Sequence, residues 1–320
     1  TAATGVSDTR AVFEASNALS STVGDLTAEK RTSVNKKVVA ALKTVIASKI
    51  DGDNGNKNTM SSDERRSTID ALDALTEKQS PEELAEVEAD VADAVLTVLE
   101  KSDSEENAID ATEDADAVLR VLAKLRHSDN KEKCVERLSK SLAAAAATGV
   151  RTKLFKAGNL TVAGVNRPGD DLGASTIASG DSSLTLPAGD AVQKLLGTNE
   201  LSVVSLSTTA NTENELGTAG LGDEYRAAAT DVVDYSLQVD GEDTAVQNVA
   251  DGMTIKLSIK RPAGKKSGED GGEKKAAYVC RYWDTDKKEW TDSGVTFVAV
   301  RDVSGSAAEL ECKTTHLSVF

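Results

Sequence analysis

The spacing of apolar residues changes near residue 150, and this change divides the chain into two parts. From residue 1 to about 149, apolar residues recur every three or four positions, which is the period of an amphipathic helix. The apolar stripes are Val34, Val38, Leu42, Val45 and Ile46; Ile69, Leu72 and Leu75; Leu84, Val87, Val91, Val95 and Val98; Val118, Leu119, Leu122 and Leu125; and Val135, Leu138 and Leu142. This pattern predicts five or six antiparallel helices, each burying one face against its neighbours.

Capping residues mark where several of these helices begin and end. Ser80, Pro81 and Glu83 stand at the N-cap, first and third positions of a helix start, which completes a capping box. Ser61 with Glu64 predicts a second start, and Gly149 suits the left-handed residue that ends the last helix.

From about residue 150 onward, short segments rich in β-branched residues alternate with Gly, Asp, Asn and Pro turns. The predicted strands are residues 160–165, 183–186, 201–206, 232–239, 253–259, 277–282 and 295–300, with one short helix at 188–196 and a flexible loop at 262–275. Many short strands without long helices between them favour two packed antiparallel sheets. We therefore predict an α+β chain, with a helical bundle in residues 1–150 and a β-sandwich in residues 151–320.

Charge and hydropathy exclude several classes of function. The net charge is −16, and no Lys/Arg stripe alternates with aromatic residues, so we expect no nucleic-acid or anionic-lipid partner. The longest apolar run, residues 143–147, is too short to cross a bilayer. No signal peptide is recognisable at Thr1, and we expect the chain to be a piece of something larger.

The sequence predicts no metal or cofactor site. The three cysteines, Cys134, Cys280 and Cys312, include no CxxC pair, and the chain has two histidines, which argues against zinc. Residues 51–56 invite a calcium-loop interpretation, but Asn56 stands where an EF-hand needs glycine and Ser62 where it needs an acid. A polar loop between helices is the better interpretation.

A group of residues near the C-terminus carries the strongest functional signal. Cys280 and Trp283 are followed by Trp290, Gly294, Cys312 and then by His316, Leu317 and Ser318. The last tripeptide alone is weak evidence, because a strand end with a surface histidine would look the same. The residues that precede the tripeptide strengthen this evidence, since both tryptophans of the chain fall within eight residues of each other.

This arrangement resembles the proteolysis site of the GAIN domain, the autoproteolytic module before the first membrane span of adhesion receptors and polycystin-1-like proteins. The family motif runs Cys-x-x-Trp, Trp, Gly-Cys, Cys-x-Cys-x-His-Leu and then Thr or Ser. The resemblance covers the whole chain, because the family fold is a helical subdomain followed by a β-sandwich subdomain that holds the cleavage site. It implies a motif at about residues 278–320 and a scissile bond between Leu317 and Ser318.

Two departures from the family motif concern its cysteines. The second family cysteine aligns with Val295 and the fourth with Thr314; since these two normally bond to each other, one crosslink is lost without stranding a thiol. The resemblance implies that Cys280 and Cys312 keep the other disulfide, as in the polycystin-like branch. Cys134 is left over on the apolar side of a predicted helix, where a buried thiol is expected.

The residue types in the tripeptide fit the chemistry of self-cleavage. A serine hydroxyl becomes a nucleophile when a base takes its proton, and histidine titrates near neutrality. Side chains two apart in a strand share a face, which places His316 beside Ser318, and a sharp kink would improve their contact. Ser318 would attack the Leu317 carbonyl, giving an N→O acyl shift and an ester that water hydrolyses. Oxyanion donors are not identified by the sequence; the Thr315 hydroxyl is one candidate.

Two further hypotheses compete with self-cleavage. The fold could serve as an uncleaved structural or adhesive module of a large cell-surface or ciliary protein. A conventional hydrolase ranks last, because His127 lies in a helical segment and no carboxylate pair stands out.

The resemblance also implies partners and a location. They are the chain's own C-terminal strand from Ser318 onward after cleavage, a downstream transmembrane region and, as further candidates, a polycystin-2-like channel or an extracellular protein ligand. The location implied is the extracellular face of the plasma or ciliary membrane. There, the sequon at Asn159 would be a glycosylation candidate.

Overall fold

A computed structural model describes most of the chain and shows an α+β fold. The described residues are 18, 27–48, 62–77, 79–100, 113–126, 128–145, 154–199, 202–212, 216, 219–220, 230–259, 278–303 and 307–320. Residue contacts group the chain into two compact units, Thr1–Ala145 with Phe155–Leu160, and Ala146–Leu154 with Thr161–Phe320. The predicted fold class is confirmed. The boundary at residue 150 stays a prediction, because residues 146–153 lie outside the described part.

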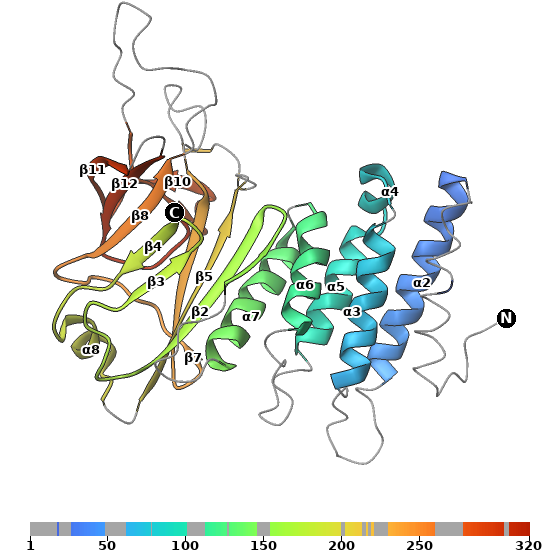
Figure 1. The fold of residues 1–320 in the computed structure, drawn as a ribbon, viewed down its shortest axis with the longest axis horizontal. Coiled ribbons are helices and arrows are strands. Elements are labelled where there is room, and N and C mark those ends of the chain that lie inside the picture. The colour runs from blue at the N-terminus through green and yellow to red at the C-terminus, as the bar shows by residue number, and fades with distance from the viewer. Residues whose placement is uncertain are drawn as a thin grey trace, which may run out of the picture. The chain divides into compact units, whose positions relative to one another are not determined.

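The first unit is a bundle of helices that lie side by side (Figure 1). They are α2 (Ala28–Ser48), α3 (Ser62–Glu77), α4 (Pro81–Ala85), α5 (Glu88–Glu100), α6 (Glu113–Lys124) and α7 (Asp129–Ala145). Helix α3 packs against α6, and α5 packs against both α2 and α7. All the predicted stripe residues are buried except Val34, which is partly exposed.

The predicted start at Ser80 is present in full. The Ser80 hydroxyl accepts from the Glu83 N–H, and the Glu83 carboxylate accepts from the Ser80 N–H, which satisfies two backbone donors at the helix end. These bonds lower the pKa of Glu83, the Ser80 N–H being the largest cause. A turn at residues 86–87 then separates α4 from α5, so the stripe from Leu84 to Val98 spans two helices.

The second unit contains two antiparallel sheets and a hairpin. One sheet has the order β1-β2-β5-β6-β7, the other has the order β11-β12-β8-β4-β3, and the hairpin is β9-β10. The strands are β1 (Phe155–Ala157), β2 (Leu160–Pro168), β3 (Thr176–Ser179), β4 (Ser182–Thr185), β5 (Val203–Asn211), β6 (Val232–Val239), β7 (Glu242–Asp243), β8 (Met253–Ile259), β9 (Tyr282–Asp284), β10 (Glu289–Thr291), β11 (Val295–Val303) and β12 (Ala307–Thr314). One short helix, α8 (Ala191–Leu196), follows β4.

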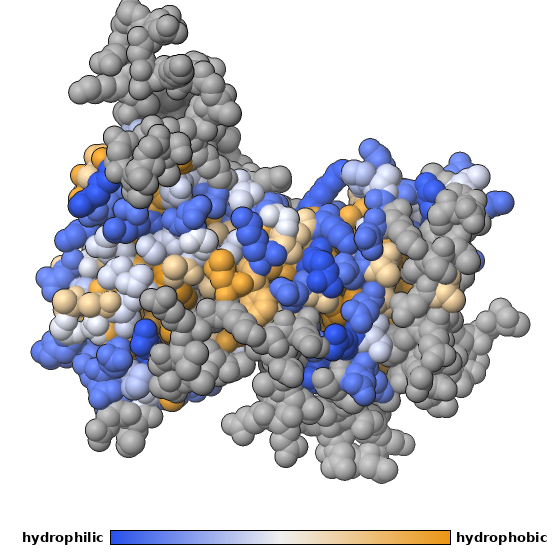
Figure 2. Space-filling view, in the orientation of Figure 1, coloured by the Kyte–Doolittle hydropathy of each residue, from blue (hydrophilic) through white to orange (hydrophobic). Residues whose placement is uncertain are grey.

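A single apolar core fills the space between these sheets. Alternate residues of β6, β8 and β12 point into it, including Tyr235, Ile255 and Leu310. The other face of β12 carries charges that pair with neighbouring strands, Glu309 with Lys256 and Glu311 with Arg301. Figure 2 shows hydrophilic residues on the visible face of each unit, with hydrophobic residues between them.

Some sequence predictions are wrong in detail. Residues 278–281 form no strand, and β9 begins only at Tyr282. The short helix begins at Ala191 rather than residue 188, since Gly189 adopts a left-handed φ of 82° that a helix excludes. Ser61, Gly149, His127 and the segments 51–56 and 262–275 lie outside the described residues.

Candidate cleavage site

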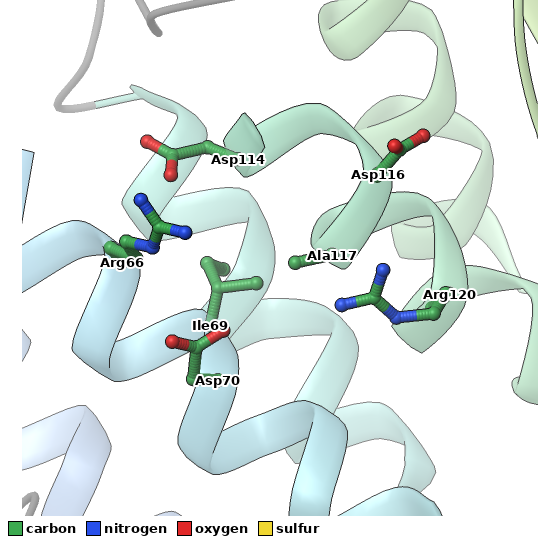
Figure 3. Close-up of a pocket in the computed structure, with 7 residues that line it drawn as sticks. All are labelled: Arg66, Ile69, Asp70, Asp114, Asp116, Ala117 and Arg120. Carbon is green, nitrogen blue, oxygen red and sulfur yellow. The ribbon is translucent and has the colours of Figure 1, made fainter. Parts of the chain in front are cut away.

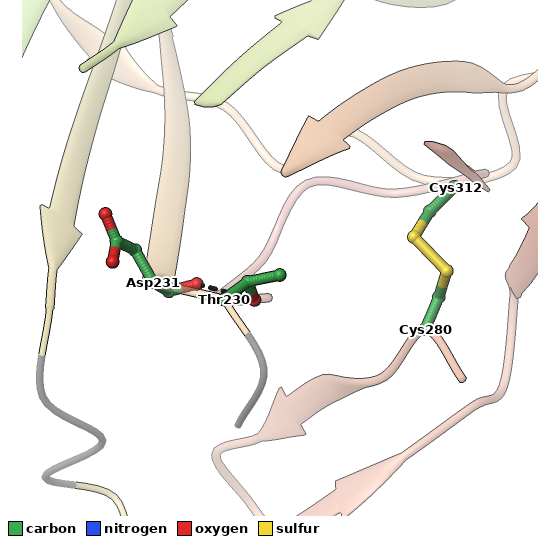
Figure 4. Close-up of a disulfide and its surroundings, with 4 residues drawn as sticks. All are labelled: Thr230, Asp231, Cys280 and Cys312. Atoms are coloured by element: carbon green, nitrogen blue, oxygen red, sulfur yellow. Dashed lines mark hydrogen bonds between the residues drawn. A yellow bond between two sulfur atoms is a disulfide. The ribbon is translucent and has the colours of Figure 1, made fainter. Parts of the chain in front are cut away.

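A disulfide joins Cys280 to Cys312, as Figure 4 shows. The two Cα atoms lie 6.1 Å apart, and both side chains are buried in the sandwich core. Cys312 lies in β12, which is paired on one side with β11 and on the other with β8. The crosslink therefore fixes the chain just before β9 to an inner strand of a sheet. In the same view, Thr230 and Asp231 mark where the chain enters β6.

The two tryptophans face each other across the β9–β10 hairpin. Trp283 and Trp290 are direct partners in the pairing, and their rings meet edge to face with centroids 5.6 Å apart. The hairpin turn is closed by the Asp284 carboxylate, which accepts from the N–H groups of Asp286 and Lys287 and from the Lys287 ammonium. This packing of the two rings stabilises the hairpin, and β9 of the hairpin pairs with Val319.

The last residues lie between β6 and β9 as a short extended segment. Val319 forms antiparallel bridges with Asp234 on one side and with Trp283 on the other. The Trp283 N–H donates to the Val319 carbonyl at 2.8 Å, and Phe320 exchanges two bonds of 2.7 Å with Val233. Phe320 is buried, with its ring 6.4 Å from that of Tyr235. Residues 318–320 are thus held by backbone bonds on both sides.

His316 lies in a close aromatic environment at the bend between β12 and this segment. The Tyr282 ring meets the imidazole edge to face at a centroid distance of 4.3 Å, and the Phe320 ring lies 6.0 Å away. The His316 Nε2 atom is buried and has no hydrogen-bond partner within the described part of the chain. Burial lowers the pKa of His316 below its ordinary value of 6.5. At neutral pH the imidazole is therefore uncharged, which is the form that accepts a proton.

Gly294 makes room for this histidine. Its φ is 75°, a left-handed conformation that side chains rarely adopt, and an added Cβ would lie 3.0 Å from His316 Nδ1 and 2.8 Å from Thr315 Oγ1. A residue without a side chain is therefore required at position 294, both by the turn before β11 and by the close approach of the imidazole.

Leu317 and Ser318 lie beside His316, but the hydroxyl and the imidazole are not hydrogen-bonded to each other. The Ser318 hydroxyl donates to the Trp283 carbonyl at 3.4 Å, while the Leu317 N–H donates to the Val246 carbonyl at 3.1 Å. Among the described residues, no hydrogen bond reaches the Leu317 carbonyl oxygen. The Thr315 hydroxyl, the oxyanion donor suggested by the sequence, instead points to the Gly294 carbonyl at 3.4 Å.

The two positions where the resemblance expects further cysteines face each other across the β11–β12 pair. Val295 and Thr314 are direct partners, and both are buried. The Thr315 N–H donates to the Gly294 carbonyl at 3.0 Å, which makes Val295 and Thr314 a pair without mutual hydrogen bonds, the closer kind in an antiparallel ladder. The two positions where the resemblance expects bonded cysteines are therefore neighbours in the structure.

The other sequence candidates lie apart from this group. Asn159 stands at the β1–β2 turn, partly exposed, with its Oδ1 atom enclosed and without a partner in the described residues. Cys134 is a buried free thiol in α7, where its sulfur donates to the Ala92 carbonyl at 3.3 Å.

A charged cavity of about 330 Å³ opens between α3 and α6 (Figure 3). Arg66 and Asp70 line it from α3, and Asp114, Asp116 and Arg120 line it from α6. Arg120 also bonds Asp73 at 2.8 Å. The lining offers no serine, cysteine or histidine as a nucleophile or base, so it gives no support to a conventional hydrolase.

The described residues contain neither a metal cluster nor a membrane-spanning helix. No group of three or more His, Cys, Asp or Glu residues is arranged to hold a metal ion there. None of the helices described is long and apolar enough to cross a membrane.

Comparison with known proteins finds distant likeness to solved structures alone. No protein-family model and no curated protein matches the sequence. The full extracellular region of zebrafish Gpr126/Adgrg6 superposes with a TM-score of 0.44 at 14% identity, covering 82% of this chain. The chain spans 35% of the length of that structure.

Proposed function

We propose that this chain is a GAIN-like module that cleaves itself once, between Leu317 and Ser318. His316 acts as the base, Ser318 as the nucleophile, and the Cys280–Cys312 disulfide with the Trp283–Trp290 hairpin holds the site together. The observation that carries the proposal is the half-buried His316, whose pKa burial lowers, whose enclosed Nε2 atom has no partner in the described residues, and which stands two residues before a serine. A buried polar atom without a partner is costly to folding, and such atoms cluster where chemistry uses them.

The reaction needs one rotation and one proton carrier. Rotation of the Ser318 side chain away from the Trp283 carbonyl frees its hydroxyl, and His316 Nε2 accepts the hydroxyl proton. The oxygen attacks the Leu317 carbonyl carbon, the C–N bond breaks, and the proton passes to the leaving Ser318 amine. Water then hydrolyses the ester between Leu317 and Ser318, which leaves a Leu317 carboxylate and restores the hydroxyl.

The product stays associated after the bond is broken. Residues 318–320 keep their backbone hydrogen bonds to β6 and β9, and Phe320 stays in the core. The cleaved strand is then the first partner of the remaining chain, held without a covalent bond.

A disulfide supports an oxidising location. We place the module on the extracellular side of a polycystin-1-like or adhesion-receptor-like membrane protein. A transmembrane region, a polycystin-2-like channel or an extracellular protein ligand would be its further partners, and Asn159 its glycosylation site.

One observation favours a second function, an uncleaved structural or adhesive module of the same fold. The Ser318 hydroxyl is bonded to Trp283 rather than to His316, and no donor within the described residues stands ready for an oxyanion at Leu317. If the serine never rotates, the site would serve only to close the sandwich.

Denaturing electrophoresis separates the two functions. We expect the chain with a reporter domain fused after Phe320 to run as two fragments, the smaller beginning at Ser318 by N-terminal sequencing. The same sample should elute as one species from a sizing column without denaturant, because the strand stays bound. An intact chain under denaturing conditions would exclude cleavage and leave the structural module.

The pH dependence of cleavage follows from the lowered pKa of His316. The reactive form is the uncharged imidazole, which is populated above the pKa of His316. Burial places that pKa below 6.5, so the cleavage rate should be constant at neutral pH. The cleavage rate should fall only when the pH drops below the pKa of His316. The measurement is the time course of fragment formation after unfolded, uncleaved chain is diluted into buffers from about pH 5 to about pH 8. A rate that already falls between about pH 8 and pH 7 would contradict it.

A further inference from the structure

The Thr314 hydroxyl makes two hydrogen bonds to the backbone of His316. It donates to the His316 carbonyl at 2.9 Å and accepts from the His316 N–H at 3.3 Å. Thr314 is the last residue of β12, and the chain bends at the next two residues. One side-chain oxygen is therefore bonded to both peptide groups that flank the His316 Cα atom.

Bonds to both flanking peptides restrict the two backbone dihedral angles of His316. Those angles set the direction of its Cα–Cβ bond, and hence where the imidazole lies relative to Tyr282 and Ser318. In a continuous strand the His316 N–H and carbonyl would bond to neighbouring strands. Here the Thr314 hydroxyl takes both, and so replaces the strand by a bend.

The surroundings make this hydroxyl hard to replace. Thr314 is fully buried, with Val295 opposite it in β11 and Met253 opposite it in β8. Both of these partners have apolar side chains, so they offer no substitute donor or acceptor. Water does not reach the position, which strengthens the two bonds.

We infer that Thr314 is a positioning residue for the cleavage reaction, whose hydroxyl holds the bend that aims His316 at Ser318. This inference rests on the proposed self-cleavage. It assigns a function to a position where the resemblance expects a cysteine. A disulfide-bonded sulfur has no proton to donate to the His316 carbonyl, so the two-bond arrangement is a property of threonine or serine at this position.

Three variants test this role. Thr314→Val keeps the shape and removes the hydroxyl; we expect cleavage to slow by about 10²-fold, which is typical when a reacting group is misplaced. Thr314→Ser keeps the hydroxyl and should cleave within about threefold of the parent chain. Val295→Ala removes buried packing from the facing position but no hydrogen bond, and its cleavage rate should match the parent chain.

A second measurement does not depend on cleavage. In the Ser318→Ala background, the His316 ring signals are followed by NMR over a pH titration, and His316→Ala identifies them between the two histidines. Thr314→Val should shift or broaden these signals and change the apparent pKa of His316, whereas Thr314→Ser should leave them in place.

The outcomes distinguish the inference from the proposed function. If the parent chain cleaves and Thr314→Val cleaves at the same rate, or if Val295→Ala slows cleavage as much as Thr314→Val, the positioning role is wrong. Unchanged His316 signals in Thr314→Val would also overturn it. If the parent chain does not cleave, the proposed function fails, and the NMR comparison alone decides whether Thr314 orients His316.

Discussion

Replacing Ser318 with alanine should leave a single uncleaved chain, and replacing His316 with alanine should do nearly the same. Without the hydroxyl no ester can form, so Ser318→Ala should give no small fragment at any time. Without the imidazole the hydroxyl keeps its proton, and the rate should fall by about 10²–10⁴-fold, the usual contribution of a general base. Both variants should stay folded, because neither side chain is fully buried in the core.

Matched controls separate lost chemistry from lost structure in this experiment. Ser318→Thr keeps a hydroxyl at the same place and should still cleave. His127→Ala removes the other histidine of the chain and should cleave like the parent chain. Unchanged far-UV circular dichroism and tryptophan fluorescence would show that the folds are preserved. Cleavage in Ser318→Ala, or full-rate cleavage in His316→Ala, would refute the assigned chemistry.

The sequence predicts the two halves of this fold well, because each half has a strong period. The helical stripes and the strands β6 and β8 coincide with the predicted positions, since one face of each is buried and the other is polar. β12 shows the same alternation of Ala308, Leu310 and Cys312 with charged residues, yet it is missing from the predicted strands. The alternation of apolar and charged residues in this segment is visible in the sequence and predicts a strand.

Other features depend on contacts that no local pattern records. The hairpin strands β9 and β10 have three residues each, too few for a period to appear. The two-sided pairing of Val319 joins residues more than thirty positions apart, so only the folded chain shows it. The Thr314–His316 bonds are local, but a threonine two residues before a histidine has no distinctive pattern. The bend at residues 315–316 is present, and the Thr314 hydroxyl bonds to the backbone of His316 within it.

The Cys280–Cys312 disulfide should contribute several kcal/mol to the stability of the β-unit. It closes a loop with a sequence separation of 32. In the chain-entropy model such a loop stabilises the fold by about 3–4 kcal/mol, by restricting the unfolded chain. We therefore expect Cys280→Ala/Cys312→Ala to lose about that much free energy of unfolding, and the double variant avoids leaving one reactive thiol.

Urea unfolding followed by tryptophan fluorescence measures this loss of unfolding free energy in the β-unit, which contains the disulfide. Both tryptophans of the chain lie in the β9–β10 hairpin, so fluorescence reports this unit, while far-UV circular dichroism at helical wavelengths follows the helices. Cys134→Ala is the matched control, because its buried thiol in α7 forms no crosslink. An unchanged fluorescence midpoint in the double variant would contradict the prediction.

The same double variant connects stability to cleavage. Because Cys280 lies two residues before β9, losing the crosslink frees the strand whose Tyr282 ring packs on His316 and whose Trp283 holds Val319. Cleavage should therefore slow even at temperatures where the sandwich is still folded. If fragment formation in the folded double variant kept the parent rate, the disulfide would stabilise the unit without positioning the site.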